Sequence, residues 1–413
     1  MPERRTMRLS PENNSLVFAA LAHGIMHLFA AFYFTIVLAL EIAWQRPFAE
    51  LIALWTPAAI LIGLAALPAG WLADRWSARG MIALAFAGMG VFSIVAGFID
   101  GPATLLPVLA AIGIFAAVYH PVGIPWIMRV ARHNPGKALA INGLFGGVGV
   151  GIGGLSAGAL IDFAGWQAAF IVPGLISLAV AVAMALFIRA GRIAEPRRQP
   201  GARHGQPTRD ERFRGISILL ATTFAGGLTY QVTQSAAPKL FDARLGEFLG
   251  DGTFGIGLVV FAVYFLSGFG QLAGGWLADR WSWKGAYIVA WCINLPMLWI
   301  AATLAGPGLV IVVIVMTTAA TSALPAESLL FARFVPERRH GLFFGIRYVL
   351  ALGAAPIAIQ FVAYVQSATG DFVWLYWTLG AMAVAVIATI AFLPPVRAGR
   401  APEAERAAAA AAQ

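Results

Sequence analysis

The chain is poor in charge. Only 11% of its 413 residues are Asp, Glu, Lys or Arg, whereas 60% are hydrophobic and the mean hydropathy is +0.79. A soluble domain carries about 25% charged residues, and here the charged residues gather in brief clusters between long apolar stretches. The composition therefore excludes a protein whose whole surface faces water.

Cysteine is almost absent, since Cys292 is the single one and lies inside an apolar run. A disulfide framework is therefore excluded. The chain also lacks a Ser-His-Asp order, a metalloprotease histidine pair and paired carboxylates on one helix, so no enzyme chemistry is indicated. The glycine-rich stretch 143–158 has no Lys-Ser/Thr ending, which excludes a phosphate-binding loop and favours close helix packing.

Long apolar segments fill most of the chain. Twelve of them are long enough to cross roughly 30 Å of hydrocarbon as helices. Their approximate ranges are 16–40, 50–73, 80–99, 103–129, 137–161, 166–189, 215–238, 253–278, 285–305, 308–333, 341–366 and 372–393. The first follows a basic start, as in a secretory signal, but it is too long for a cleaved signal core. We expect an all-α polytopic membrane protein.

An internal duplication organises these segments. The sequence Gly-Trp-Leu-Ala-Asp-Arg-Trp-Ser occurs at 70–77 and again at 275–282, a separation of 205 residues. Six segments belong to each copy, which predicts two pseudo-symmetric six-helix bundles. We expect the chain to divide into a bundle at 1–190, a cytoplasmic linker at 191–214, a second bundle at 215–396 and a flexible tail at 397–413.

The basic residues favour one side of the membrane. If the amino terminus, alternate turns, the linker and the tail share that side, they hold 24 of the 28 lysines and arginines. The opposite side holds Arg46, Lys239 and Arg244, and Arg347 lies within a segment. Both termini should therefore face the cytoplasm. Nucleic-acid binding is the rival interpretation of a pI near 10.2, but cations scattered over turns make a poor binding stripe.

The duplicated turn resembles the signature between the second and third helices of the major facilitator superfamily. Residues 70–75 with Arg79 carry the match, and 275–280 with Lys284 repeat it. Gly-Trp-Gln at 165–167 also fits the start of the sixth helix. The resemblance covers nearly the whole chain and implies the major facilitator fold, with twelve transmembrane helices in two bundles.

The chain also departs from the family pattern. Ser77 and Ser282 stand where the family has its second glycine, and Ala78 and Trp283 stand where it has a basic residue. The stretch 143–158 lacks the Gly-Pro pair of the antiporter signature. This last difference weakens an assignment as a drug-proton antiporter.

The duplicated aspartates are expected to latch one conformational state. Each ends its segment on the cytoplasmic side, where a carboxylate can meet a cation or the positive start of a neighbouring helix. Arg129 is the candidate partner of Asp74, and Arg333 is the candidate partner of Asp279. We predict a cytoplasmic gate formed by Asp74, Arg75, Arg129, Asp279, Arg280 and Arg333. The alternative is that these charges only cap the bundles and fix the topology.

Polar side chains inside the segments are few, and each charge there costs roughly 2.5–3.5 kcal/mol on insertion scales. They are therefore candidates for function. The resemblance implies that the first, fourth, seventh and tenth helices line a central cavity, and most of these side chains fall on those segments. The predicted cavity and proton-coupling residues are His23, His27, Tyr119, His120, Asn142, Tyr230, Gln231, Gln234, Glu327 and Arg347.

The shift of 205 residues relates several of these positions. It maps His120 onto Pro325, and Asn142 onto Arg347. Proline interruptions at matching positions of two repeats point to a transporter's binding site. We therefore predict that the fourth and tenth segments are both broken, at the same depth.

Glu327 and Arg347 are expected to meet. A rise of 1.5 Å per residue places them about 9 and 10 Å inside Arg333 and His340. A carboxylate that alternates between a proton, the substrate and Arg347 would couple transport to protons. Two alternatives are a permanent structural ion pair and an arginine that binds an anionic substrate bidentately.

The three intramembrane histidines allow three interpretations. They could relay protons, coordinate a transition metal, or form hydrogen bonds within the bundle. His23 and His27 have the helical spacing of a ligand pair. We assign no metal, because the segments 16–40 and 103–129 offer no Asp, Glu or Cys beside them. Together with His23, the Tyr-His-Pro stretch at 119–121 and its following glycine are similar to fosmidomycin-resistance-type exporters.

The expected function is secondary active transport by alternating access. Without a nucleotide-binding cassette, transport must use an ion gradient or run downhill. We expect proton-coupled export of a small amphipathic or anionic compound by a monomer in a bacterial inner membrane, without cofactor or nucleic acid. The alternatives are uptake of an organic acid or metal chelate, and a transport-inactive sensor or assembly factor.

Overall fold

A computed structural model describes residues 9–131, 135–195, 208–336 and 340–394, and within these ranges all regular structure is helical. Part of the predicted linker and the whole predicted tail lie outside the described residues. Twelve helical stretches within them are long and apolar enough to cross a membrane, as the sequence predicts. The helices are α1 (Pro11–Trp44), α2 (Phe48–Ala53), α3 (Thr56–Leu64), α4 (Ala66–Arg75), α5 (Ala78–Ala96), α6 (Pro102–Ala116), α7 (Tyr119–Val130), α8 (Pro135–Ala164), α9 (Trp166–Arg189), α10 (Arg209–Leu249), α11 (Phe254–Arg280), α12 (Trp283–Thr303), α13 (Gly308–Phe334), α14 (His340–Thr369) and α15 (Val373–Ala391).

The fourth membrane segment is broken, and the tenth is not. The break between α6 and α7 falls at 117–118, because Pro121 has no N–H to donate to the carbonyl of Ala117. The tenth segment, α13, runs through Pro325 without interruption, so the prediction of a matching break was wrong there. A further proline, Pro125, follows four residues beyond Pro121, and the fourth segment also contains Pro107, whereas α13 contains one proline.

Local signals explain where two helices begin. The hydroxyl of Thr208 accepts a hydrogen bond from the Glu211 N–H, and the Glu211 carboxylate accepts one from the Thr208 N–H. This capping box starts α10 earlier than the apolar pattern predicts. The start of α9 follows Gly165, whose φ of +85° lies in the region that favours glycine.

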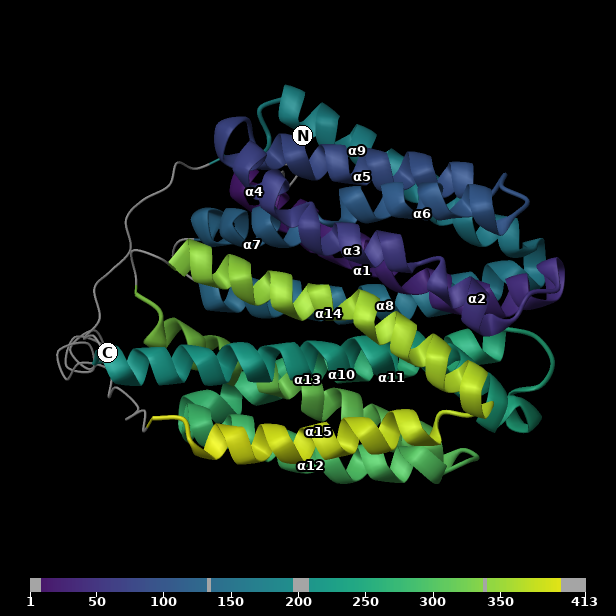
Figure 1. Ribbon diagram of the computed structural model, residues 1–413. Coiled ribbons are helices and arrows are strands. Elements are labelled where there is room, and N and C mark those ends of the chain that lie inside the picture. Colours follow the sequence, from purple (N-terminus) through teal and green to yellow (C-terminus); the bar gives the residue numbers. More distant parts are fainter. Residues whose placement is uncertain (1–8, 132–134, 196–207, 337–339, 395–413) are drawn as a thin grey trace, which may run out of the picture.

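The helices form two sets that follow the duplication. We call α1–α9 the N-half and α10–α15 the C-half; Figure 1 shows the N-half above the C-half, with α8 and α14 at their boundary. At the seam α8 packs on α11, and α14 packs on α2 and α3. This agrees with the two bundles that the sequence predicts.

Glycines allow the two halves to approach closely at the seam. A Cβ atom on Gly147 would lie 3.2 Å from the Cα of Gly268, and one on Gly63 would lie 3.7 Å from the Cα of Gly353. The shift of 205 residues carries Gly63 onto Gly268. The two crossings are therefore related by the internal symmetry of the chain.

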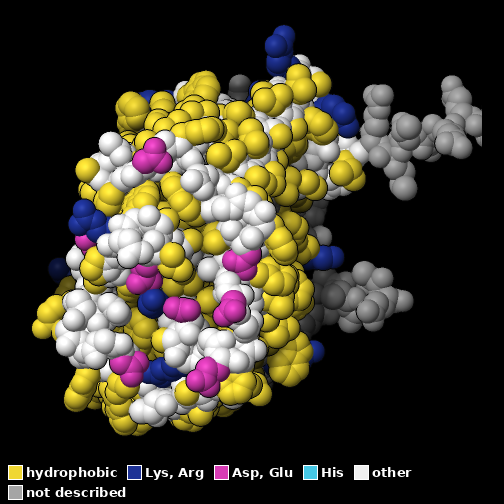
Figure 2. Space-filling view, turned by 90° about the vertical axis from the view of Figure 1, so that its right-hand side faces the viewer, with side chains coloured by type: hydrophobic (Ala, Val, Ile, Leu, Met, Phe, Trp, Pro, Cys, Tyr) yellow, Lys and Arg dark blue, Asp and Glu magenta, His cyan; other side chains and the backbone are white. Residues whose placement is uncertain are grey.

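Several polar contacts between the halves lie at one end of the helices. Lys239 of α10 contacts Glu41 of α1 at 2.7 Å. The Asp162 carboxylate of α8 accepts hydrogen bonds from the N–H groups of Thr253 and Phe254, where α11 starts. Figure 2 shows this end, with charged side chains near its centre and hydrophobic side chains on its flanks.

The flanks of the molecule are apolar. On α9, for example, Leu175, Val182 and Leu186 are each more than half exposed. Large apolar side chains exposed along several membrane-length helices match a surface that faces lipid.

The basic residue that follows each duplicated turn anchors the exit of the last helix in its own half. Arg79 donates to the carbonyl of Ile193 and contacts the Glu195 carboxylate at 2.9 Å. Lys284, its counterpart after the shift of 205 residues, donates to the carbonyls of Ala391 and Leu393. The duplicated motif thus closes each bundle.

We expect that enlarging a seam glycine destabilises the protein. A Cβ atom on Gly257 would lie 2.5 Å from the backbone oxygen of Gly154, so Gly257→Ala should lower stability by about 1–3 kcal/mol. The measurement is the thermal unfolding midpoint in detergent. Gly246→Ala is the matched control, because nothing lies within 4 Å of an added Cβ there. Equal midpoints for the two variants would contradict the packing described here.

A second prediction concerns Asp371, which precedes α15. Its carboxylate accepts hydrogen bonds from Arg244 at 2.8 Å and from the Phe372 N–H at 2.6 Å. Burial alone would raise the pKa of Asp371, but these bonds and the Arg244 charge bring that pKa below its ordinary value. The stabilisation is therefore present above the unfolded pKa of about 3.9 and lost as the pH falls through the folded pKa.

Asp371→Asn should accordingly lower stability at pH 7 by at most about 1 kcal/mol, because the pair is partly exposed. The variant should also lose less stability than the wild type between pH 7 and pH 3. Unfolding midpoints at both pH values measure this difference. An acid loss as large in the variant as in the wild type would show that Asp371 is not responsible.

Candidate functional site

A hydrogen-bonded cluster joins three helices inside the N-half. The Tyr119 hydroxyl of α7 donates to Oδ1 of Asn142 on α8 at 2.5 Å. The ring nitrogen Nδ1 of His23 on α1 lies 2.6 Å from the backbone oxygen of Asn142. The His23 ring stacks on Tyr119, with centroids 4.7 Å apart. Asn142 therefore satisfies polar groups from both of its neighbours.

His27 and His120 complete this cluster. The ring centroids of His23, His27 and His120 lie 4.8–5.5 Å apart, and one ligand atom of each lies within 4.8 Å of the others. Both ring nitrogens of His120 are buried and lack a hydrogen-bond partner among the described residues. The structure thus brings together the three histidines that the sequence singled out.

The C-half holds an ion pair at its centre. Glu327 of α13 lies 3.4 Å from the Arg347 guanidinium of α14. It also accepts a hydrogen bond from the Thr223 hydroxyl of α10. Arg347 donates to the Ser328 hydroxyl at 3.1 Å, and Glu327 and Arg347 are only 5% and 7% exposed. The meeting of these two residues, predicted from their depth, is confirmed, although its role is untested.

The two clusters are related by the duplication. Asn142 and Arg347 are equivalent under the shift of 205 residues, and each bonds to the fourth helix of its own half. The first helix of each half joins in, through His23 in one case and Thr223 in the other. The repeats have kept the position of the polar centre while changing its chemistry from imidazole and amide to an ion pair.

Tyr348 connects the two clusters. Its ring stacks on His120 across the seam, with centroids 5.5 Å apart and an interplanar angle of 19°. The Arg347 guanidinium carbon lies 6.0 Å from the same ring. Tyr348 and Thr223 were missed in the sequence analysis. The position of Tyr348 beside an intramembrane charge was the available signal.

The polar residues of α10 lie further along that helix. Gln234 is 11 residues beyond Thr223, or roughly 16 Å by helical rise. It is 5% exposed, and its amide nitrogen has no hydrogen-bond partner among the described residues. The Tyr230 ring lies 6.2 Å from that of Tyr264, and Gln231 is half-buried. The structure does not place these three side chains in either cluster.

The predicted gate residues lie at the ends of their helices. Arg75 lies 4.0 Å over the Trp71 ring, and Arg280 repeats this geometry at 4.4 Å over Trp276. Within the described part of the chain, the exposed Asp74 carboxylate has no hydrogen-bond or ion-pair partner.

The positions of the other three gate residues do not test the predicted pairing of Asp74 with Arg129 and of Asp279 with Arg333. Arg129 is half-buried near the end of α7, and Arg333 is exposed near the end of α13. The side chain of Asp279 lies outside the described residues. The gate therefore stays a prediction.

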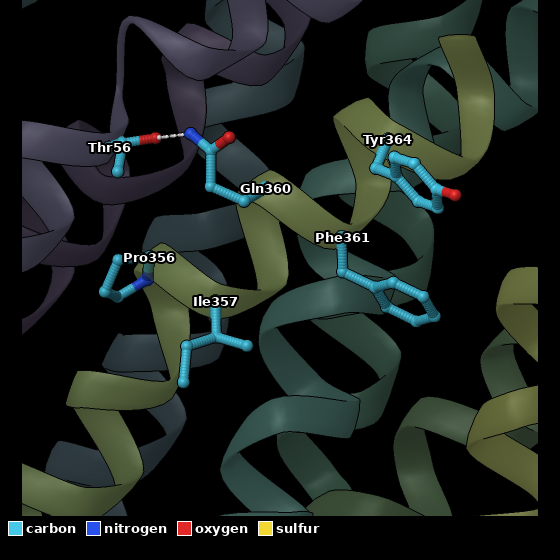
Figure 3. A pocket seen from close by; sticks show the side chains of 6 residues that line it. All are labelled: Thr56, Pro356, Ile357, Gln360, Phe361 and Tyr364. Atoms are coloured by element: carbon cyan, nitrogen blue, oxygen red, sulfur yellow. Dashed lines mark hydrogen bonds between the residues drawn. The ribbon is translucent and has the colours of Figure 1, made fainter. Parts of the chain in front are cut away.

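A shallow groove lies on the outside of the seam between α3 and α14. Figure 3 shows its lining, in which Gln360 donates a 2.7 Å hydrogen bond to Thr56 across the seam. The other lining residues are Pro356, Ile357, Phe361 and Tyr364. They lie 9–17 residues beyond Arg347 on α14, or roughly 13–25 Å. This groove is therefore separate from the buried clusters.

Comparison with known proteins places the chain in a family. The family model of the Major Facilitator Superfamily matches residues 16–248. The chain is 28% identical over 266 residues to a gallate transporter from Pseudomonas putida, covering 53% of this chain and 56% of that one. It is 27% identical over 203 residues to a cephamycin export protein from Amycolatopsis lactamdurans, covering 48% and 40%. The chain thus spans about half the length of the curated relatives it matches.

Solved structures share the fold. A bacterial homolog of the human lysosomal transporter Spinster, in an inward-facing and unoccupied conformation, aligns with a TM-score of 0.62. Its sequence is 16% identical, and the alignment covers 92% of this chain and 94% of that one. The occupied inward-facing form aligns with a TM-score of 0.65, also at 16% identity, over 93% and 94% of the two chains.

We expect the central ion pair to respond differently to single and double neutralisation. Glu327→Gln leaves the buried Arg347 without its carboxylate partner, which should cost about 3–5 kcal/mol. Adding Arg347→Gln removes the remaining charge and should recover most of that loss. Unfolding midpoints in detergent measure both. A double variant less stable than Glu327→Gln alone would contradict this account.

Proposed function

Because the chain belongs to the Major Facilitator Superfamily, we propose that it is a secondary active transporter, not an enzyme, and moves a small molecule across the membrane by alternating access. The two halves meet along a glycine-lined seam, and the contacts of Lys239 and Asp162 join them at one end. This arrangement suits two rigid bundles that rock about the seam. The substrate path would run between them, beside the clusters at His120 and Arg347.

We place the ion pair between Glu41 and Lys239 on the outer side of the membrane. The support is the distribution of basic residues, 24 of 28 of which fall on the side of the termini. The bacterial relatives support a bacterial inner membrane.

The Glu327–Arg347 pair is the observation that carries the proposed mechanism. Both side chains are almost fully buried, so an ionised Glu327 needs its arginine partner. Protonation of Glu327 would release Arg347 to bind an anionic group of the substrate bidentately. Return of the carboxylate to Arg347 would then expel the substrate as the proton leaves. Because the proton and the anion bind together and leave together in this cycle, it describes symport, which an inward proton gradient drives towards uptake. For the proposed export the proton and the substrate must compete: the ionised Glu327 would hold a hydrogen-bond donor of the amphipathic compound, and a proton taken up by Glu327 would displace it.

Uptake of an organic acid is the second candidate. The gallate transporter is one of the relatives reported above, and the same arginine could bind a carboxylate that enters the cell. The cephamycin export protein favours the outward direction instead. A transport-inactive sensor would require neither Glu327 nor Arg347.

Flux in proteoliposomes tests the proposal. Purified protein should move a substrate found by screening, with gallate included, when a proton gradient is imposed. Glu327→Gln should reduce gradient-driven flux at least about tenfold, because an amide cannot exchange the proton. Glu50→Gln is the matched control, since Glu50 is an exposed residue at a helix start. Flux that does not depend on the proton gradient, or that is equal in the two variants, would contradict the proposed proton coupling.

A further inference from the structure

The three histidines of the N-half have the arrangement of metal ligands. His23 and His27 come from one face of α1, and His120 comes from the broken segment at the start of α7. One nitrogen of each ring lies within 4.8 Å of the others. Tetrahedral coordination at about 2.0–2.1 Å places ligand nitrogens about 3.3–3.4 Å apart, so metal binding requires the rings to turn towards one another.

The hydrogen bond of His23 occupies one ring nitrogen and leaves the other free. Nδ1 of His23 lies 2.6 Å from the backbone oxygen of Asn142 and 3.1 Å from its amide nitrogen. Because a backbone carbonyl can only accept, we assign the proton to Nδ1 from the shorter contact. The lone pair is then on Nε2. Metal-bound histidines almost always donate their other N–H to a carbonyl or carboxylate, which fixes the ring and its tautomer. Asn142 supplies that second contact here.

The surroundings of His120 provide a second observation, independent of the spacing of the three rings. Both of its ring nitrogens are buried and have no hydrogen-bond partner among the described residues. A buried polar group of this kind is costly unless something binds it. A purely structural role through hydrogen bonds, one of the three interpretations left open by the sequence, therefore does not account for His120. A ligand that accepts its lone pair accounts for one of the two nitrogens.

We propose that His23, His27 and His120 bind one divalent late first-row transition-metal ion, with Zn²⁺ as the reference. Imidazole ligands suit Zn, Cu and Ni better than Mg or Ca. Three histidines with an open fourth position are an established zinc arrangement, so the lack of a nearby carboxylate or thiolate is no obstacle. Tyr348 stacks on His120 from the other half.

Direct metal binding tests this site. The untagged full-length protein in detergent is dialysed against buffered Zn²⁺, and bound zinc is counted by mass spectrometry. We expect one ion per chain. His120→Gln and His27→Gln should each weaken zinc binding by at least about 10-fold to 100-fold, the loss typical of even outer-shell changes. Zinc X-ray absorption should show three imidazole ligands in the wild type and two in His120→Gln.

The chain supplies its own control in His133, His204 and His340. The triple variant with Gln at those positions should bind zinc as the wild type does. Loss of binding in that triple variant, unchanged binding in a monodisperse His120→Gln protein, or no saturable binding in the wild type would each overturn the proposal. No gradient or vesicle is involved, so the result is independent of the proton-coupled transport proposed above.

Discussion

A charged or hydrogen-bonding group inside hydrocarbon must find its partner within the protein, and the interior of this molecule follows from that constraint. Asn142 and Arg347 occupy equivalent positions of the two repeats, and each bonds to helices of its own half. Polar contacts at the centre of each half therefore hold its helices together. The helices that share these contacts cannot rotate relative to one another without breaking the contacts, so each half is suited to move as a rigid body.

Contacts between the halves have a different character. Along the seam close contacts are made by glycine backbones, as at Gly147 and Gly268, and polar contacts such as that between Glu41 and Lys239 join the halves at one end. Backbone packing gains little from specific partners and can be exchanged for a similar packing after a rotation. Polar bonds that hold each half together, and backbone packing that can be exchanged between them, favour rocking over internal rearrangement.

Much of the fold could be predicted from the sequence, because hydropathy and an exact duplication fix the number of membrane crossings and the relation between the bundles. Depth along the helix was sufficient to predict that Glu327 would meet Arg347. Depth was insufficient to predict the contacts of Thr223 and Tyr348, because contacts between side chains of different helices also depend on how each helix is rotated and tilted. The predicted break at Pro325 was wrong because repeat symmetry matches positions and takes no account of how many prolines lie near them. The fourth segment has Pro121 and Pro125 close together, whereas α13 has Pro325 alone.

Tyr348 gives the two polar centres a physical connection. Its ring contacts His120 of one half and lies beside Arg347 of its own half, and a rocking motion about the seam would separate it from His120. A ligand that binds more tightly when His120 is uncovered would therefore favour the separated state, and one that needs the stacked ring would favour the other. By linkage, occupancy of the histidine cluster and the state of the Glu327–Arg347 pair must then influence each other to the same degree.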